Sequence, residues 1–462
     1  MLRLLAVFAL LLSPALAQPP NVVFILADDL GYGDLGCYGH PKFRTPRIDQ
    51  LAKQGVRLTQ FNTPAPFCAP TRAALLTGRY PFRCGMTANP APDATPAADA
   101  VALPAGEVTL ARVLKTAGYA TALFGKWHLG HHAGSLPTDR GFDEYLGIPY
   151  SNDMRPAHLL EGSKVVEYPV VQATLTERLS KRAADFIRRR AGQPFFLLYA
   201  DPMPHKPLAA SEAHYRRSGA GLYGDALLEL DAGVGRVLDA LDQAGVADHT
   251  LVVFTSDNGP WFGGSTGGLR GMKASQWEGG YRVPMIARWP GKIPAGRVSD
   301  GLGITMDLFA TALKATGTAL PDARVLDGRD LLPLLRGEAA SPHAFIFGHQ
   351  GPQLGCVRDA RWKLHVLPAV GMRFKAGPDG RWPDPRAPDG VTLLAPYEQY
   401  NLESMPGLTT GVAAAPMQLF DLANDPGEQR DVAAEHPEVV RRLRAAHEAM
   451  SRDVPMPSKA PR

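Results

Sequence analysis

Polar residues follow four short apolar runs of the sequence, at the points where the runs end. The runs cover residues 22–26, 120–124, 195–199 and 251–254. The polar residues are carboxylates, an amide and cations, namely Asp28 and Asp29, Lys126 and His128, His205, and Asp257 with Asn258. Hard oxygen ligands without a cluster of thiols or imidazoles favour Ca²⁺ or Mg²⁺. The cations, with the later Lys273, could surround an anionic substrate. We therefore expect one site for a dication and an anion.

Each of these features also has a simpler interpretation. An Asp-Asp pair could cap a helix, and Asp-Asn-Gly is a common turn sequence. A lone histidine after a strand is usually solvated, and we assign four others to that class: His131, His132, His158 and His249. Ligands of open α/β sheets bind beyond the carboxyl ends of the strands. The coincidence at four strand ends therefore favours a shared site over unrelated turns.

A further candidate, Cys68, lies in the segment 66–79. Pro70 suits the first turn of a helix and Gly78 suits a C-terminal cap, so we predict a helix that begins near Cys68. Backbone N–H groups and the helix dipole would bind an oxyanion there, and Arg72 is one turn further on. An unmodified Cys68 would be either a low-pKa nucleophile or a buried structural thiol.

The elements that position these residues alternate along the chain. Helical patterns at residues 109–117, 175–190 and 225–244 separate the apolar runs, which indicates an α/β domain with a mainly parallel sheet. Beyond about residue 335 the pattern changes to strands at 344–347 and 356–366, a Pro/Gly-rich stretch at 367–406 and a helix at 437–450. We predict a catalytic domain over residues 18–335 and a smaller C-terminal α+β domain over 336–462, with residues 89–104 as a surface loop.

Composition excludes several classes of protein. A chain of 462 residues, 45% hydrophobic, can form two or three domains with real cores. A net charge of +4 leaves no basic stripe, so nucleic-acid binding is not expected, and four cysteines do not make a disulfide scaffold. Residues 1–17 are typical of a secretory signal peptide, and no later run is apolar enough for a membrane anchor. We expect a periplasmic or secreted protein, cleaved near Ala17-Gln18.

The segment Cys-Ala-Pro-Thr-Arg at 68–72, followed by Ala-Ala-Leu-Leu-Thr-Gly-Arg, resembles the signature of the formylglycine-dependent (type I) sulfatases. Other motifs are similar to that family in order: residues 28–36, 125–130, 147–151, 256–259, 277–280, 419–422 and 425–428. Within the family the likeness is greatest to arylsulfatase A and N-acetylgalactosamine-6-sulfatase. The resemblance implies an alkaline-phosphatase-like fold, with a large mixed, mainly parallel sheet flanked by helices and an antiparallel sheet in the smaller domain.

The resemblance also implies a role for each candidate residue. Cys68 would be oxidised to formylglycine by a maturation enzyme, and the hydrated aldehyde would be the nucleophile. Asp28, Asp29, Asp257, Asn258 and the modified Cys68 would hold one Ca²⁺, in preference to Mg²⁺. Arg72, Lys126 and His128 would surround the hydrated aldehyde. His205 and Lys273 would grip the sulfate, and Ser151 matches a more weakly placed serine. Thr71 stands where serine is commonest in the family, which keeps the hydroxyl.

The expected substrate is a sulfated small molecule or glycan, and two other functions remain open. A phosphomonoester or phosphodiester hydrolase would also combine a bound metal ion with an anionic substrate, although the sequence supplies ligands for only one metal ion. A non-catalytic binder of sulfated glycans would result if Cys68 were not oxidised. The sequence leaves open the substrate itself, the oligomeric state and any pairing of Cys37, Cys84 and Cys356.

Overall fold

A computed structural model describes residues 18–92, 95–154, 157–261, 263–322, 324–351, 353–369 and 411–454. The expected signal peptide and most of the Pro/Gly-rich stretch lie outside the described residues. Within the described residues, no helix combines the length and apolarity that crossing a membrane requires.

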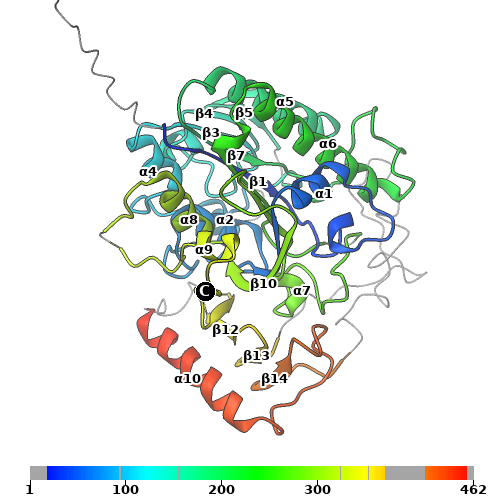
Figure 1. Ribbon diagram of the computed structural model, residues 1–462, viewed down its shortest axis with the longest axis vertical. Coiled ribbons are helices and arrows are strands. Elements are labelled where there is room, and N and C mark those ends of the chain that lie inside the picture. The colour runs from blue at the N-terminus through cyan, green and yellow to red at the C-terminus, as the bar shows by residue number, and fades with distance from the viewer. Residues whose placement is uncertain are drawn as a thin grey trace, which may run out of the picture.

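A ten-stranded sheet forms the centre of the molecule (Figure 1), in the order β10-β2-β9-β8-β1-β7-β3-β4-β5-β6. Five of its nine strand pairs are parallel: β10 with β2, and the four pairs among β8, β1, β7, β3 and β4. Strands β9 and β5 pair antiparallel with both of their neighbours. The strands are β1 (Asn21–Ala27), β2 (Val56–Asn62), β3 (Ala120–Gly125), β4 (Glu144–Gly147), β5 (Leu159–Glu161), β6 (Lys164–Glu167), β7 (Phe195–Ala200), β8 (Thr250–Ser256), β9 (Met285–Arg288) and β10 (Arg297–Ile304).

Helices cover both faces of this sheet. Side chains of β1 alternate between the two cores, with Val23 and Ile25 in one and Val22 and Phe24 in the other. The first core includes α1 (Pro46–Lys53), α5 (Leu175–Arg190) and α6 (Gly221–Gln243). The second includes α2 (Cys68–Thr77), α4 (Leu110–Thr116), α8 (Asp307–Thr316) and α9 (Leu332–Arg336). Burial on both faces explains why these strands are continuously apolar.

A separate antiparallel sheet follows in the C-terminal part, in the order β11-β12-β13-β14. Its strands are β11 (Ile346–Gln350), β12 (Gln353–Arg358), β13 (Trp362–His365) and β14 (Gln418–Asp421). Helix α10 (Pro437–Asp453) packs Leu443 against Val357 and Leu364 of this sheet. The fold class predicted from the sequence, a mainly parallel sheet flanked by helices plus a smaller antiparallel sheet, is confirmed.

Two local predictions were wrong. The run 356–366 is two strands, because the Asp359 carboxylate accepts hydrogen bonds from the backbone N–H groups of Arg361 and Trp362 and so stabilises a turn. The segment 89–104 is not simply a surface loop: it contains the short helix α3 (Pro96–Asp99), whose first turn is capped by the Thr95 hydroxyl. Other short helices in the described part of the chain are α7 (Glu278–Tyr281) and the 3₁₀ turns at Gly36–Tyr38, Pro137–Arg140, Gln172–Thr174 and Ala247–His249.

Candidate active site

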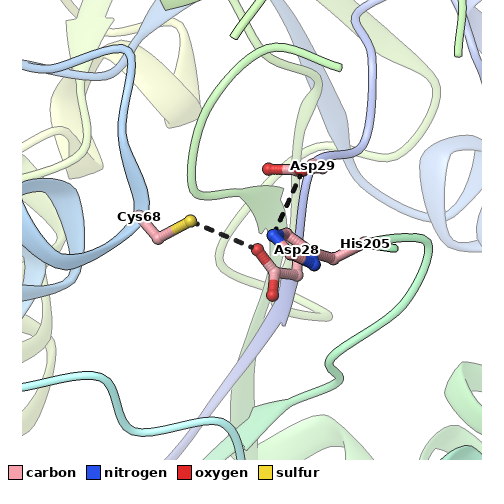
Figure 2. A group of neighbouring side chains, drawn as sticks. All are labelled: Asp28, Asp29, Cys68 and His205. Carbon is pink, nitrogen blue, oxygen red and sulfur yellow. Dashed lines mark hydrogen bonds and ion pairs between the residues drawn. The ribbon is translucent and has the colours of Figure 1, made fainter. Parts of the chain in front are cut away.

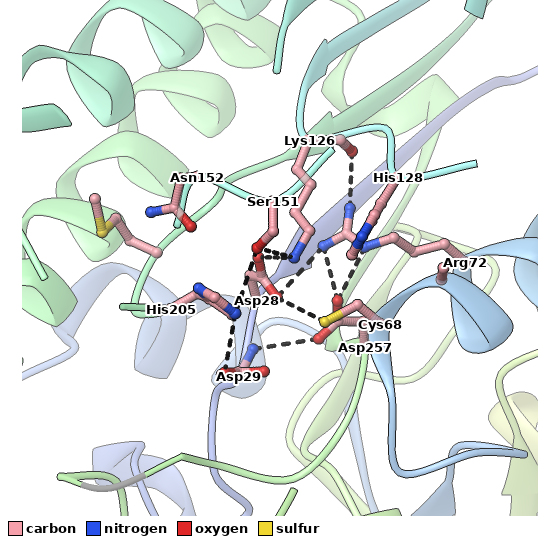
Figure 3. Close-up of polar contacts among 12 residues, drawn as sticks. Asp28, Asp29, Cys68, Arg72, Lys126, His128, Ser151, Asn152, His205 and Asp257 are labelled. Carbon is pink, nitrogen blue, oxygen red and sulfur yellow. Dashed lines mark hydrogen bonds and ion pairs between the residues drawn. The ribbon is translucent and has the colours of Figure 1, made fainter. Parts of the chain in front are cut away.

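The four strands whose ends carry the predicted residues are neighbours in the sheet, in the order β8-β1-β7-β3. Because these strands are parallel, their carboxyl ends meet at one edge. Figure 3 shows that the predicted side chains from all four ends converge there with Cys68 and Arg72 of α2. Nearly all of these side chains are almost fully buried. Lys273, which reaches the same place from a later loop, is the most exposed of them at 9%.

Each carboxylate in this cluster is paired with a cation. Lys126 Nζ lies 2.6 Å from Asp28 Oδ2, and Lys273 Nζ lies 2.7 Å from Asp29 Oδ1. Arg72 Nε and Nη2 lie 2.9 and 2.8 Å from Asp257 Oδ2. The site therefore joins three carboxylates and three cations that are all largely shielded from solvent.

The pKa values of the carboxyl groups reflect their burial and the repulsion among their negative charges. Burial, followed by the charge of Asp257, raises the pKa of Asp28 to about 7, and burial also raises the pKa of Asp29. Burial acts in the same direction on Asp257, but the Arg72 guanidinium and the two lysines outweigh it and lower the pKa of that carboxyl. A further cation at this place would relieve the repulsion among the three carboxylates.

The residues present fit a hard dication. Asn258 donates from Nδ2 to Asp29 Oδ1, and its own Oδ1 is buried without a hydrogen-bond partner among the described residues. Oxygen atoms of Asp28 and Asp29 lie within 4.8 Å of each other, of Cys68 Sγ and of a His205 ring nitrogen. Three carboxylates and an unpaired amide oxygen form a donor set typical of Ca²⁺.

Cys68 is the first residue of α2, as the sequence predicted, and Gly78 ends that helix with a φ of 69°. Its sulfur lies 3.6 Å from Asp28 Oδ1 (Figure 2). Burial raises the pKa of the thiol and outweighs the opposite effect of Lys126 and Lys273. Of the two interpretations of an unmodified Cys68, this direction favours the buried thiol over the low-pKa nucleophile, because burial opposes the thiolate.

The His128 ring is held in one tautomer. Nε2 lies 3.1 Å from the carbonyl oxygen of Pro90 and so carries the proton, while Nδ1 is buried without a hydrogen-bond partner in the described part of the chain. Burial, followed by the charges of Lys126 and Arg72, lowers the pKa of His128 far below its usual value. His128 is thus a neutral imidazole with a free lone pair beside Arg72 (Figure 3).

His205 and Ser151 are neighbours within the same cluster (Figure 3). The Nδ1 atom of His205 hydrogen-bonds to the Lys206 carbonyl, so Nε2 faces Ser151 Oγ at 3.4 Å and Asp29 Oδ2 at 3.6 Å. Lys126 Nζ donates to Ser151 Oγ at 3.1 Å. Burial and the nearby Lys273 lower the pKa of His205, so its ring is also neutral.

Lys273 reaches the site from a loop well beyond the end of β8, which is why the strand-end pattern alone could not place it. The loop closes on itself through a 2.7 Å hydrogen bond from Gly279 N to Arg270 O. The backbone N–H of Lys273 donates to Pro260 O and that of Ala274 to Pro66 O, which attaches the loop to the segment before Cys68.

A second buried network, which sequence reasoning did not find, lies behind this loop. The Glu278 carboxylate contacts Arg282, Arg358 and Lys363, and Glu428 contacts Lys363 and His365. Both glutamates belong to motifs that were noted only for their resemblance. Lys363 and His365, two basic residues at alternate positions among Trp362, Leu364 and Val366, are the signal that could have suggested buried acidic partners.

Comparisons with known proteins point to one family. A family model described as sulfatase matches residues 20–318. Human arylsulfatase A is 38% identical and the alignment covers 94% of this chain and 88% of that protein. N-acetylgalactosamine-6-sulfatase from Canis lupus familiaris is 42% identical, over 75% of this chain and 72% of that protein.

Solved structures show the same likeness along nearly the whole chain. A chain solved in work on glycosaminoglycan metabolism by Bacteroides thetaiotaomicron superposes with a TM-score of 0.78 at 27% identity, covering 94% of this chain and 100% of that chain. A protein crystallised with a neocarrahexaose gives 0.76 at 28% identity, covering 96% and 94%. These likenesses confirm the alkaline-phosphatase-like fold that was expected.

Proposed function

Because the chain belongs to the sulfatase family, whose members hydrolyse sulfate esters, we propose that it cleaves aryl or carbohydrate sulfate monoesters with a nucleophile made from Cys68 and a bound Ca²⁺. One observation carries the proposal. The Cys68 sulfur lies at a buried helix N-terminus, 3.6 Å from Asp28, and Asp28 in turn pairs with Lys126. We further propose residues 18–335 as the catalytic domain and 336–462 as the smaller domain.

Three cations support the binding of a sulfate group. Arg72, Lys126 and Lys273 are all buried, and nearby carboxylates raise the pKa of each above its ordinary value despite burial. All three are therefore protonated at neutral pH. Positive charge fixed in a dry site stabilises the oxygens of a sulfuryl group as it is transferred, as it does for phosphoryl groups.

Hydrated formylglycine at position 68 would supply a hydroxyl nucleophile, and Ca²⁺ held by Asp28, Asp29, Asp257 and Asn258 would make that hydroxyl more acidic and neutralise charge on the sulfate. Asp257 is ionised and is the carboxylate that could accept a proton from a nucleophile at residue 68, since Arg72 holds it in place through two nitrogens. His128 offers a second acceptor, because its Nδ1 lone pair is free and its ring is neutral.

The leaving oxygen needs a proton, and Lys273 is better suited to give it than His205. Lys273 keeps its proton at neutral pH, whereas burial and the charge of Lys273 itself keep the pKa of His205 low. We assign to His205 Nε2 the role of positioning the ester by contact. The adjacent Asn152 has a buried Oδ1 without a partner among the described residues, which supports contact with a hydroxyl of a sugar substrate. The neocarrahexaose complex of a relative also supports a carbohydrate.

The test is mass spectrometry of the tryptic peptide 58–72 from active protein made in its native host, together with rates on a nitrophenyl sulfate and the matching phosphate. We expect formylglycine at position 68, an unmodified thiol in the peptide that holds the equally buried Cys84, and much faster sulfate hydrolysis. Full activity with an unmodified Cys68 would disprove the nucleophile, and preference for the phosphate would disprove the substrate class.

A further inference from the structure

Two consecutive histidines and an aspartate meet outside the site described above. His131 Nε2 lies 2.9 Å from Asp99 Oδ1, and His132 Nε2 lies 3.1 Å from Asp99 Oδ2. The three donor atoms of Asp99, His131 and His132 all lie within 4.8 Å of one another. The centroids of the two imidazole rings are 4.1 Å apart and the ring planes are inclined by 41°. Each ring directs its Nε2 atom at the Asp99 carboxylate.

The backbone brings these residues together from two segments. Leu103 N donates to Leu129 O at 3.0 Å, which joins the segment after α3 to the segment after His128. Gly130 has a φ of 112°, and a Cβ there would lie 2.7 Å from the Cβ of Ala102 and 2.8 Å from that of Ser135. Only glycine permits this close approach, which places His131 and His132 opposite the last residue of α3.

We propose that Asp99, His131 and His132 form a second metal site, for Zn²⁺, distinct from the site at Asp28. Tetrahedral Zn²⁺ has bonds of about 2.0–2.1 Å to nitrogen and oxygen, which places its ligand atoms roughly 3.3 Å apart. The two nitrogen-to-oxygen distances are close to that value. Two imidazoles and one carboxylate suit Zn²⁺ and other late first-row dications, whereas Ca²⁺ takes oxygen ligands.

The site has room for an exogenous fourth ligand. The His131 side chain is 13% exposed and those of Asp99 and His132 are 36% and 55% exposed, so one side of the triad faces solvent. Three protein ligands and an open position are the arrangement in which Zn²⁺ binds water or a ligand group. A bound ion would also fix α3 to the segment that follows His128. The His128 ring is itself bonded to the carbonyl oxygen of Pro90, a few residues before α3.

The test uses untagged full-length protein that carries Cys68→Ala, so that neither a tag nor the Cys68 thiol beside Asp28 competes for soft metals. The protein is saturated with Ca²⁺ and titrated with Co²⁺, whose visible absorption reports coordination number and imidazole ligation. We expect one equivalent to bind with a tetrahedral or five-coordinate spectrum that Zn²⁺ abolishes. Because Ca²⁺ fills the Asp28 site and catalysis is not measured, the result does not depend on the proposed reaction.

Three variants locate the ion: Asp99→Asn, His131→Gln and His132→Gln. Each should weaken Co²⁺ binding by at least the ~10–100-fold that loss of an outer-shell partner costs. His249→Gln, which removes an exposed histidine bonded to Gln18 O, should bind as the parent does. His132 is exposed, so its replacement leaves the fold intact. Absence of saturable Co²⁺ binding, or equal affinity in the parent and all three variants, would overturn the proposal.

Discussion

The carboxylate of Glu428 accepts a hydrogen bond from the backbone N–H of Glu278, which links the segment after β14 to the loop that carries Lys273. Arg270, at the start of that loop, donates to the carbonyl oxygens of Glu428 and Val412 and stacks on Trp277 with its guanidinium carbon 3.5 Å from the ring centroid. Residues before and after β14 therefore hold the loop that carries Lys273 in place.

Replacing Glu428 by Ala should destabilise the protein and misplace Lys273. The carboxylate is fully buried and holds Lys363 and His365, and breaking such a pair costs on the order of 3–5 kcal/mol. Urea unfolding measures the loss, and a rise in KM for a nitrophenyl sulfate measures the displacement. Glu435→Gln, at an exposed pair with Arg430, is the control and should change neither.

Arg72→Lys should lower kcat/KM at least about a hundredfold, because one ammonium cannot replace a planar group that contacts two partners. Arg72 reaches Asp257 through Nε and Nη2 and the Lys126 carbonyl through Nη1. Steady-state kinetics with a nitrophenyl sulfate provide the measurement, with the exposed Arg188→Lys as control. A loss below tenfold would show that charge alone suffices.

If Lys273 protonates the leaving oxygen, Lys273→Ala should slow an alkyl sulfate at least about tenfold more than a nitrophenyl sulfate, since nitrophenolate leaves without a proton. Rates on a series of leaving groups should show a steeper dependence on leaving-group pKa than the parent enzyme. Lys181→Ala, at an exposed pair, serves as control. An equal loss on every substrate would assign Lys273 to sulfate binding only.

Removal of the metal should reduce both activity and stability. Repulsion among Asp28, Asp29 and Asp257 is relieved when a dication binds, and a ligand at about a hundredfold excess over its Kd stabilises the folded state by ~2.7 kcal/mol. Exhaustive chelation should lower Tm, and Ca²⁺ should restore it better than Mg²⁺. Asn258→Ala should require more Ca²⁺ for the same effect. Unchanged Tm and activity after chelation would contradict the metal site.

His349 should make stability depend on pH. Burial lowers the pKa of His349 from an unfolded value of 6.5 to about 4. Between these two pKa values the unfolded chain binds a proton at His349 that the folded chain does not bind. The contribution of the neutral His349 to the free energy of unfolding is therefore complete above pH 6.5 and is lost as the pH falls toward 4. By pH 5 the loss is about 2 kcal/mol. Urea unfolding at pH 7 and pH 5 should show it, and His349→Asn should reduce the difference while His249→Asn does not.

The sequence alone placed most of the candidate site, because parallel strands bring their carboxyl ends together. A residue that follows such a strand can be found from the hydrophobic pattern of the strand and its position after it. This holds for Asp28, Lys126, His128, His205 and Asp257. Lys273 was found only through resemblance, since a loop that folds back from a distant segment leaves no periodic signal.

Features that depend on partners remote in sequence were beyond the sequence analysis. Asp99 ends α3 and His132 lies in a loop, and the close approach at Gly130 that brings them together has no signature in local propensity. Strand β2 also went unpredicted, because it alternates buried and half-buried residues instead of forming an apolar run. Whether Cys68 is oxidised cannot be read from residue identity, because the oxidation is a chemical modification of the finished side chain. Its oxidation to formylglycine stays a prediction.

The central place of β1 has a consequence for the order of events during synthesis. Its neighbours β7 and β8 begin at Phe195 and Thr250, so β1 and the adjoining α2 cannot be enclosed until the chain has been made as far as residue 256. In the finished molecule the Cys68 side chain is only 1% exposed. An enzyme that modifies this sulfur therefore has to act before the sheet closes over it, on a chain that has not finished folding.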